Sequence, residues 1–595
     1  MEAAMYLNYL VHVPQPRTGI SIKTIKGTKY VYYNYGYRYN KEKKRTEPQS
    51  TSIGKCDADN PDMMYPNQNY LKYFPNEERQ DEPRSSCLRI GAFLVIRKII
   101  RDYHLDKMAE SIVGKQAGLF LDLAAYSIVM ENNAGQYYPD YAYNHPLFTE
   151  NMKVYSDSTV SRFINGLTGE QSAQFLNEWN ACRDHRERIY ISYDSTNKSS
   201  QAGDIDIVEY GHPKVDEGAP IFNYAVAYDR TNSVPLFYES YPGSISDVSQ
   251  FKFMIDKAIG YGYRRVAFIL DRGYFSKTNI QYMMAKGFGF IIMVKGMKAL
   301  VSKLVLECKG KFEEKREYSI REFNVSGMTV KRRMYPEDNQ DSYFHIYYST
   351  GKCAGERERL ESRFDQMAKA IKMQEGKPVV FGKPYTDYFN FIYDDSFGDG
   401  KPQLMFATEK KDSMNYAISL CGYFVIITSE RMTAKEALIT YKSRDVSEKL
   451  FRGDKSYLNE KSMRSQSREN LESKLFIEFN GLIIRNKIYI NLTEEMARID
   501  KKREYMTVPA ALKELEKIEL IKLGDGSYRL DHAITATQKA ILKAFGMSEK
   551  DVADQAMELA EQLAPLPETR KDSSRQDNCS CPVQMDSNEL LVIDS

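Results

Sequence analysis

The stretch "RRVAFILDRGYFSKTNIQYMMAKGFGFIIMVKG", Arg264–Gly296, indicates the fold class of this chain. It begins with "RRVAFILDRG", a short apolar run that predicts a buried strand ending at Asp271. The segment "SKTNIQYMMAKG" predicts a helix, and "FGFIIMVKG" predicts another strand. A strand, a helix and a second strand in this order are typical of an α/β sheet.

Three more strands and a helix are predicted upstream of this stretch. The strands are "RIYISYDSTN", which we expect to end at Asp194, followed by "FNYAVAYDR" and "VPLFYESYPG". A capped helix, "SDVSQFKFMIDKAIGYG", leads from them to the strand that ends at Asp271. Three consecutive strands, then helix, strand, helix and strand, is the order of an RNase H-like α/β core with a mixed five-stranded sheet. We therefore assign residues 188–296 to the first part of such a core.

Asp194 and Asp271 are candidate metal ligands. They are expected to end neighbouring buried strands, where an α/β sheet opens its functional crevice. A single Asp at a strand end is more often a turn former, so the argument depends on the pair. With a third carboxylate, they would give the hard oxygen ligands that Mg²⁺ or Mn²⁺ prefers, and two such ions would activate water and hold a scissile phosphate. Of the seven histidines, only His212 is expected near the crevice, as a loop residue.

The stretch "YKSRDVSEKLFRGDK", Tyr441–Lys455, contains the candidate third carboxylate, Glu448. In a continuous helix, a rotation of about 100° per residue places Arg444, Glu448 and Lys455 within about 60° of Tyr441. A stripe of one carboxylate, two cations and a phenol suits a site that binds a metal and grips a phosphate. The helix must continue past Gly453 if Lys455 is to belong to the stripe.

Five other carboxylates lie close to the three candidates in sequence. Three occur in the connection after the first strand, where solvated charge is the simpler explanation, and two flank Glu448 but leave its stripe by about 60–80° on ideal geometry. They are Asp204, Asp206, Glu209, Asp445 and Asp454. We rank them below Asp194, Asp271 and Glu448 as metal ligands.

Residues 1–85 form a basic, tyrosine-rich N-terminal region. Between Lys23 and Lys55 there are nine Lys and Arg residues against two Glu, and "YVYYNYGYRYN" has six tyrosines whose alternation predicts a β-hairpin-like unit. Basic residues that alternate with aromatic residues can clamp a nucleic-acid backbone. A tyrosine-rich strand with a solvated basic loop explains the pattern equally well. The DNA-binding candidates are Lys23, Lys26, Lys29, Arg38, Lys43, Lys44 and Arg45.

The rest of the chain predicts further domains around the core. A helical domain follows the N-terminal region, a mainly β insertion interrupts the core, a helix-hairpin-helix region follows it, and the polar tail is expected to be disordered. The second part of the core has the Glu448 helix, preceded by a T-x-x-E capping box at Thr433 and Glu436. The expected boundaries are 86–187 for the helical DNA-binding or packing domain, 297–420 for the insertion, 421–495 for the second core part, 496–566 for the C-terminal region and 567–595 for the tail.

The composition argues against several classes of protein. The net charge is only +2, so an argument for nucleic acid must come from charge distribution. No stretch approaches the roughly 20 apolar residues of a membrane helix, and the N-terminus has no basic segment leading into an apolar run, so we expect neither a membrane span nor a secretory signal. The eight scattered cysteines predict free thiols in a reducing compartment and no zinc site. We expect no small-molecule cofactor.

The three carboxylates and their neighbours resemble a known family. "YKSRDVSEKLFRGDK" fits the signature Y-x2-R-x3-E-x6-K throughout and, with Asp194 and Asp271, resembles the DDE transposases of bacterial insertion sequences, in the group numbered four. "YDSTN", "YPGSISD" and "ILDRGYFS" are similar to that family's segments around the two aspartates. A β-rich insertion between the second Asp and the Glu is a feature of the group. The resemblance spans at least residues 188–490, and "LKELEKIELIKLGDGSYRL" is similar as well.

The resemblance implies cut-and-paste transposition. A transposase dimer would bind the terminal inverted repeats of an insertion sequence, cleave its ends by two-metal-ion phosphodiester hydrolysis and join the 3′-OH ends to target DNA. By position, Asp194, Asp271 and Glu448 would bind two Mg²⁺ or Mn²⁺ ions, and Tyr441, Arg444 and Lys455 would hold the terminal phosphates. The place of action implied is the nucleoid in a prokaryotic cytoplasm.

One departure and two alternatives accompany this prediction. Relatives that form a DNA hairpin use a tryptophan in the insertion to stack on a flipped base, whereas the only tryptophan here, Trp179, lies upstream of the core. A Tyr or Phe in the insertion could replace it, because stacking needs only an aromatic face. The alternatives are a non-catalytic DNA-binding regulator, which would not need intact carboxylates, and a structure-specific RNase H-like nuclease, which would not need a grip on terminal phosphates.

Overall fold

The computed structural model places most of the chain in two compact units, Met1–Ser86 and Cys87–Ser595. The residues that the structure describes are 10–14, 19–25, 27–40, 43–57, 60, 62–74, 84–185, 187–200, 205–211, 219–294, 298–394, 402–444, 463–499, 506–523 and 527–563. Glu448, Lys455 and Lys26, together with the predicted tail 567–595, lie outside these ranges.

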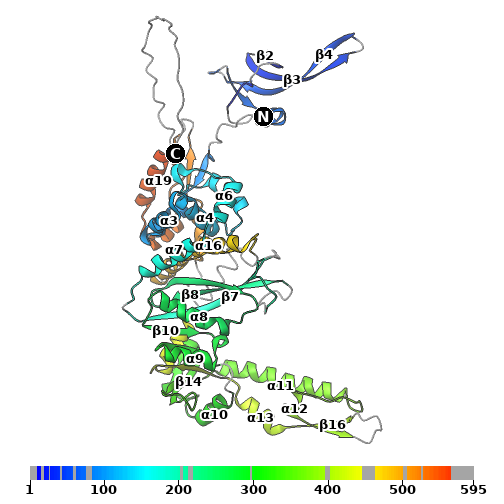
Figure 1. The fold of residues 1–595 in the computed structure, drawn as a ribbon, viewed down its shortest axis with the longest axis vertical. Helices are drawn as coiled ribbons and strands as arrows, with labels where there is room; N and C mark the ends of the chain where they lie inside the picture. Colours follow the sequence, from blue (N-terminus) through cyan, green and yellow to red (C-terminus); the bar gives the residue numbers. More distant parts are fainter. Residues whose placement is uncertain are drawn as a thin grey trace, which may run out of the picture. The chain divides into compact units, whose positions relative to one another are not determined.

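The N-terminal unit is an antiparallel sheet, which in the described residues has the strand order β1-β5-β4-β3-β2 (Figure 1). Helix α1, Gln68–Tyr73, begins after Asn67, whose side chain accepts hydrogen bonds from two backbone N–H groups of the first turn. Tyr70 of this helix packs with Val31, Ile53 and Met64 of the sheet. The strands are β1 Val11–His12, β2 Ile20–Ile25, β3 Thr28–Asn40, β4 Arg45–Cys56 and β5 Met63–Pro66.

The second unit is built on a mixed sheet. Over the described residues its strand order is β12-β13-β14-β17-β11-β10-β7-β8-β9. The strands expected from the sequence are neighbours in it: β9, β8 and β7 pair antiparallel, whereas β7, β10 and β11 pair parallel. Their bounds are β7 Ile189–Ser199, β8 Ile221–Asp229, β9 Val234–Pro242, β10 Val266–Leu270 and β11 Gly289–Met293.

This sheet is wider than the five strands that we expected. Strand β17, Tyr423–Thr428, pairs with β11 on one edge and β14 on the other. Its residues Val425, Ile426 and Ile427 are buried, so both faces of β17 lie in the protein core. The additional strands from the predicted insertion are β12 Ser319–Ile320, β13 Val325–Arg332 and β14 Ser342–Tyr348. Part of the insertion therefore extends the main sheet.

The rest of segment 297–420 differs from the predicted mainly β composition. Helix α11, Thr350–Lys372, packs against a two-stranded sheet around a small core of its own, with Phe364, Met367 and Leu404 at its centre (Figure 1). A strand pair with one covered face needs such a helix to bury its apolar side chains. The other elements are α10 Lys298–Cys308, α12 Tyr385–Tyr388, β15 Phe389–Asp394, β16 Gln403–Glu409 and α13 Lys411–Ser419.

Helices cover both faces of the main sheet. Phe251 of α8, Asp247–Gly260, contacts Phe268 of β10, with ring centroids 5.5 Å apart. The next residue, Ile269, points to the opposite face and packs with Leu438 and Tyr441 of α14, Ala434–Lys442. Helix α16, Arg468–Arg498, lies on the α14 face, because its Phe479 contacts Tyr238, which is in register with Val226 and Asp194. Helix α9, Lys277–Ala285, connects β10 to β11.

The helical segment after residue 86 and the C-terminal helices share one core with α16. Phe120 of α4 contacts Phe476 of α16 at 4.7 Å, and Gly481 brings the α16 backbone close to Ser127. Strand β6, Cys87–Arg89, pairs with β18, Glu519–Lys522, of the predicted C-terminal hairpin. The other elements are α2 Gly91–Asp102, α3 Leu105–Val113, α4 Ala117–Val129, α5 Tyr138–Asn144, α6 Asp157–Gly166, α7 Gly169–Ala181, α17 Val508–Leu515, β19 Tyr528–Leu530, α18 Ala536–Ala544 and α19 Glu549–Leu563.

One apolar stretch corrects the expectation from the sequence. Among the described residues, the helical stretch Leu105–Val129 is long and apolar enough to cross a membrane, by length and composition. Gly114, with a φ of 69°, ends α3 within it, so the stretch is not one straight helix. In its most apolar part, 67% is buried inside the protein, as expected of a core helix.

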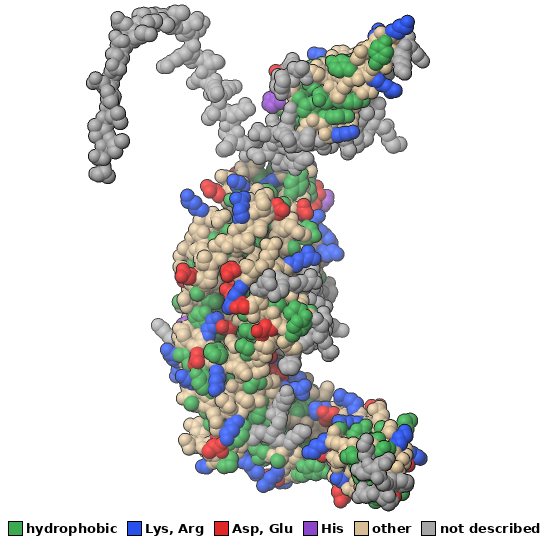
Figure 2. Space-filling model, turned by 45° about the vertical axis from the view of Figure 1, so that its right-hand side comes forward, with side chains coloured by type: hydrophobic (Ala, Val, Ile, Leu, Met, Phe, Trp, Pro, Cys, Tyr) green, Lys and Arg blue, Asp and Glu red, His purple; other side chains and the backbone are tan. Residues whose placement is uncertain are grey.

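On the face drawn in Figure 2, Lys and Arg are interspersed with Asp and Glu over the second unit.

The buried His345 of β14 predicts a pH dependence of stability. Its ring nitrogens lie 2.9 and 3.0 Å from the hydroxyls of Thr329 and Thr428, and burial lowers the pKa of His345 from 6.5 to about 4. Below pH 6.5 the unfolded chain therefore binds a proton that the folded protein does not. The contribution to stability is fully present above pH 6.5 and falls as the pH drops towards about 4, by about 2–3 kcal/mol.

Denaturant unfolding at pH 7 and pH 4.5 tests this expectation. The wild type should lose about 2–3 kcal/mol more than His345→Gln between the two pH values. His532→Gln is the matched control, because the side chain of His532 is 79% exposed. An equal pH dependence of wild type and His345→Gln would contradict the assignment.

Candidate active site

The register of two parallel strands brings Asp194 and Asp271 to the same level of the sheet. Leu270 of β10 lies opposite Tyr193 of β7, so the next residues along the two strands are Asp271 and Asp194. Because side chains alternate, both aspartates share the face of Ile269 and Ser192, which α14 covers. Neighbouring strands are about 4.8 Å apart, and both aspartates are partly exposed. The structure thus brings the two candidate ligands together.

The backbone around Asp194 differs from that around Asp271. Asp271 follows the end of β10, as the sequence predicted, and a short 3₁₀ turn, Arg272–Tyr274, comes after it. Asp194, by contrast, does not end its strand: β7 continues to Ser199. The polar residues after Asp194 remain extended because β8 pairs with β7 along its whole length, from Ile191 to Ser199.

Asp271 has two partners from the segment that contains the proposed signature. The Arg444 Nη1 lies 3.0 Å from Oδ1 of Asp271, and the Tyr441 hydroxyl donates a hydrogen bond of 3.4 Å to the same oxygen. The guanidinium also lies 5.4 Å from the centre of the Tyr441 ring. The Arg444 side chain is 12% exposed and that of Asp271 is 42% exposed, so the pair lies at the edge of solvent. Three residues chosen from the sequence thus contact one another.

The helix that places Tyr441 is shorter than predicted. The capping box at Thr433 and Glu436 is confirmed, with each side chain bonded to the backbone of the other residue. Helix α14 ends at Lys442, Ser443 is its C-cap, and Arg444 lies in the turn beyond. Tyr441 and Arg444 therefore meet at Asp271 across a helix end and not on one continuous helical stripe. Glu448 and Lys455, which complete the stripe, lie outside the described residues.

The residues present suit a hard divalent cation. Asp194 and Asp271 present carboxylates on one face, and oxygen donors are what Mg²⁺ and Mn²⁺ prefer. Within the described part of the chain, no group of three or more His, Cys, Asp or Glu side chains could hold a metal ion. Two aspartates alone are below that number, so a third ligand has to come from elsewhere, and the sequence offers Glu448.

A buried tyrosine cluster lies on the other face of β7, behind the two aspartates. Tyr193 contacts Tyr274 and Phe251, with ring centroids 5.4 and 6.0 Å apart. Burial raises the pKa of Tyr193 and of Tyr274 well above the ordinary value, and nearby negative charge, including that of Asp247, adds to the shift. These phenols therefore remain protonated at neutral pH. They form the packed support on which β7 and the turn after Asp271 rest.

The sequence did not predict a buried ion pair on the strand of Asp194. Lys198 is fully buried on β7, on the same face as Asp194, and pairs with Glu478 of α16. The Lys198 Nζ also lies 4.5 Å from the centre of the Tyr224 ring. The polar run "DSTNKS" indicates an exposed loop, and only the distant partner in α16 explains why a lysine is buried there.

The lower-ranked carboxylates have other partners or lie outside the described residues. Asp206 pairs with Arg468, and Glu209 accepts a hydrogen bond from the Ser244 hydroxyl. Those outside the described ranges are Asp204, Asp445 and Asp454, as is His212. Trp179 is fully buried in α7, where its ring N–H donates to the carbonyl of Pro235 at 2.8 Å, so it presents no free face to a base.

The DNA-binding candidates of the N-terminal unit differ in the contacts that their side chains make. Lys43 and Arg45 pair with Glu47 at 3.3 and 3.2 Å, so part of their charge is neutralised. Lys23 lies over the Tyr32 ring, with its Nζ 4.3 Å from the centre. Lys29, Arg38 and Lys44 belong to or flank the same β3–β4 ribbon.

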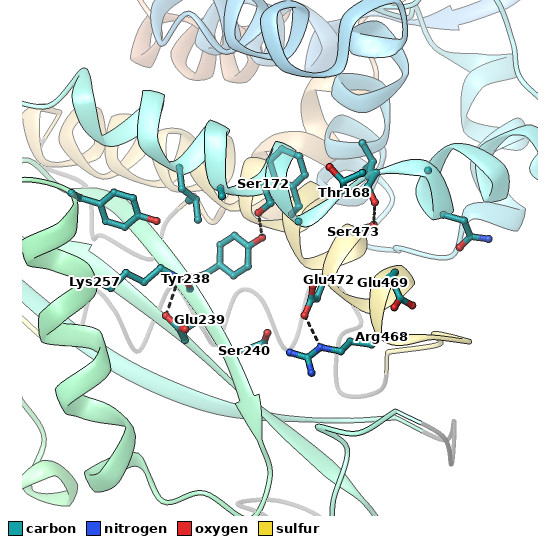
Figure 3. A pocket seen from close by; sticks show the side chains of 18 residues that line it. Thr168, Ser172, Tyr238, Glu239, Ser240, Lys257, Arg468, Glu469, Glu472 and Ser473 are labelled. Carbon is teal, nitrogen blue, oxygen red and sulfur yellow. Dashed lines mark hydrogen bonds and ion pairs between the residues drawn. The ribbon is translucent and has the colours of Figure 1, made fainter.

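A separate cleft of about 560 Å³ lies between α7, β9, α8 and the start of α16 (Figure 3). Four of its charged side chains pair with one another: Lys257 with Glu239 at 2.9 Å, and Arg468 with Glu472 at 2.9 Å. Glu469 also lines the cleft. Asp194 and Asp271 are not among its lining residues. This cleft is therefore distinct from the aspartate site.

Two carboxylates in register on parallel strands, with an arginine at one of them, define a candidate metal-dependent site for phosphoryl chemistry. Comparison with protein families agrees with this class. Residues 193–482 match the family described as "Transposase DDE domain", so the chain contains a DDE-type transposase domain.

A comparison with curated proteins gave no match. Among solved structures, the piggyBac transposase synaptic complex with hairpin DNA aligns over 82% of this chain and 88% of that chain, with 8% sequence identity and a TM-score of 0.36. A score at this level does not establish a common fold.

Proposed function

We propose that this protein is the transposase of a bacterial insertion sequence, in the group numbered four, and that residues 188–296 and 421–495 form an RNase H-like catalytic core. In this proposal it binds terminal inverted repeats, cleaves the ends and joins their 3′-OH groups to target DNA. The observation that supports it best is the register of Asp194 and Asp271 on neighbouring parallel strands, with Arg444 on Asp271. The match of residues 193–482 to the transposase DDE domain supports the same reading.

The proposed site assigns a task to each residue. Asp194, Asp271 and Glu448 would hold two Mg²⁺ or Mn²⁺ ions. When bound, these ions supply positive charge at the scissile phosphate and activate water or a 3′-OH. Tyr441, anchored in the core by α14, holds the Asp271 carboxylate through its hydroxyl. Arg444 would contact phosphate oxygens, for which its planar fork of donors is suited.

The partners in this proposal are end DNA, target DNA and a second copy of the chain. Cleaving two ends and joining them in one event requires two active sites, so we propose a homodimer on DNA. Lys455 and the basic residues of the N-terminal unit would add phosphate contacts. Because the substrate is DNA, we infer that the protein acts at the nucleoid in a prokaryotic cytoplasm.

A reconstituted reaction tests the proposal. The DNA that flanks the gene is sequenced to find inverted repeats, and the full-length protein is incubated with labelled ends, target DNA and Mg²⁺. We expect cleavage at the repeat boundary and joined products, and a chelator should abolish both. Cleavage without joining would identify a nuclease, and binding without cleavage would identify a regulator. Either result would overturn the proposal.

A further inference from the structure

A bulge in β3 of the N-terminal sheet changes the face to which the following side chains point. Residues Asn34 and Ser50 are paired, and the next pair is Gly36 with Gln49, so Tyr35 is the extra residue. Tyr33 and Tyr35 both contact Tyr73 of α1, with centroids 5.5 Å apart in each case. Beyond the bulge the alternation is shifted by one, so Tyr37 and Tyr39 point to the face that α1 does not cover.

The open face of this sheet is aromatic and basic. Following the pairing register, Lys23 lies opposite Tyr30 and Tyr30 opposite Lys55, while Tyr32 lies opposite Ser52. Beyond the bulge, Tyr37 lies opposite Pro48 and Tyr39 opposite Thr46. Among the paired positions of β2, β3 and β4, those that this register assigns to the open face include no Asp or Glu: Ser21, Lys23, Ile25, Thr28, Tyr30, Tyr32, Asn34, Tyr37, Tyr39, Thr46, Pro48, Ser50, Ser52 and Lys55.

The two tyrosines beyond the bulge are the most exposed aromatic residues of the unit that the structure describes. Tyr37 is 72% exposed and Tyr39 is 59% exposed. On the opposite face of the same ribbon, Arg38, Asn40 and Arg45 surround Glu47, so that face combines charges of both signs. In Figure 2, hydrophobic side chains, tyrosine included, lie beside Lys and Arg over this unit.

We propose that this open face, centred on Tyr37 and Tyr39, is a stacking platform for unpaired bases of a single DNA strand. Aromatic rings stack on the flat faces of bases, which a duplex keeps covered and a single strand exposes. Residues i and i+2 of a strand are about 6.8 Å apart, twice the rise of about 3.4 Å between stacked bases. The spacing of Tyr37 and Tyr39 therefore suits a base inserted between two rings.

The lysines give the platform a second component of binding. Lys23 and Lys55 flank Tyr30 on the same face, seven residues before Tyr37 and so roughly 23 Å from it along β3. They can contact the phosphates of a bound strand that runs along β3. The inference rests on the proposed function only in taking DNA as the ligand. It goes beyond a basic clamp on the backbone, because it assigns binding to the base faces and so predicts a preference for single strands over duplex.

Fluorescence anisotropy with the full-length protein tests the platform. The probes are a labelled single strand and the blunt duplex of the same sequence. The double variant Tyr37→Ala/Tyr39→Ala should bind the single strand about 10–100-fold more weakly, and Tyr37→Phe/Tyr39→Phe should remain within about 2-fold of wild type. Tyr143→Ala, at a tyrosine that is 41% exposed on α5, is the matched control.

The salt dependence separates stacking from phosphate contacts. The alanine pair should leave the slope of log K against log salt unchanged, whereas Lys23→Ala/Lys55→Ala should reduce its magnitude by about 1.4 on the single strand. A melting temperature equal to that of wild type shows that the variants fold. Wild-type affinity of the alanine pair for the single strand, an equal loss on duplex, or an equal loss in the phenylalanine pair would overturn the platform. Cleavage of transposon ends is measured separately, so failure of the platform and failure of the proposed function are distinguishable.

Discussion

Asp271→Asn and Asp194→Asn should each reduce cleavage of end DNA by the full-length protein to background, while binding of the same DNA stays within about 2-fold of wild type. An amide keeps the shape of the carboxylate but loses its charge and one strong metal-ligand oxygen. The two aspartates share one face at one level of the sheet, so the loss of either would remove a ligand from the same site. Glu448→Gln should have the same effect if the signature places Glu448 in this site.

Gel assays of cleavage and of binding, with the same labelled ends, measure the two quantities. Asp206→Asn is the matched control, because the Asp206 side chain is 63% exposed and pairs with Arg468 at the surface. Its cleavage rate should equal that of wild type, since surface substitutions away from a site have small effects. Cleavage by Asp271→Asn at a rate near wild type would remove the carboxylate site from the proposal.

The sequence predicted those parts of the fold in which local pattern and final environment agree. The run from Val266 to Leu270 is apolar and is buried on both faces of the sheet, so its prediction as a buried strand is confirmed. The same holds for the capped helices α8 and α9, whose side-chain caps Ser246 and Ser276 are visible in the sequence.

The remaining features depend on partners far away in the chain. The polar end of β7 is a strand because β8 pairs with it, and Lys198 is buried because Glu478 lies 280 residues further on. Similarly, β17 accepts β14 on its second edge, which widens the sheet beyond the expected five strands. Periodicity within a short window does not contain this information.

The candidate site was also predicted from the sequence only in part. Asp271, Tyr441 and Arg444 were chosen from residue type and spacing, and they contact one another. The geometry behind the choice was different, because α14 ends at Lys442 and no Gly or Pro in "TYKSRD" signals that end. Chemical type at a given spacing was therefore a better guide than the assumed continuous helix.

Arg444→Ala should slow joining of pre-cleaved ends by about 10–150-fold if Arg444 contacts the DNA terminus. Loss of one charge-assisted contact of roughly 1.5–3 kcal/mol gives this range. Arg444→Lys should recover only part of the rate, because a point charge does not reproduce a two-pronged guanidinium contact. Lys442→Ala is the matched control: it removes a neighbouring cation that is exposed at the end of α14 and has no place at Asp271.

The structure also offers a purely structural role for Arg444, which the same experiment separates. Arg444 neutralises Asp271 at 3.0 Å, so its removal could act through the carboxylate alone. In that case a lysine, which restores the positive charge beside Asp271, would recover the full rate, and saturating Mg²⁺ would recover the rate of Arg444→Ala. If Arg444 instead binds the terminal phosphate, neither change compensates, and the defect persists at any Mg²⁺ concentration with an unchanged melting temperature. Full recovery by lysine would reassign Arg444 to positioning Asp271, and wild-type rates in Arg444→Ala would leave it without a role in the reaction.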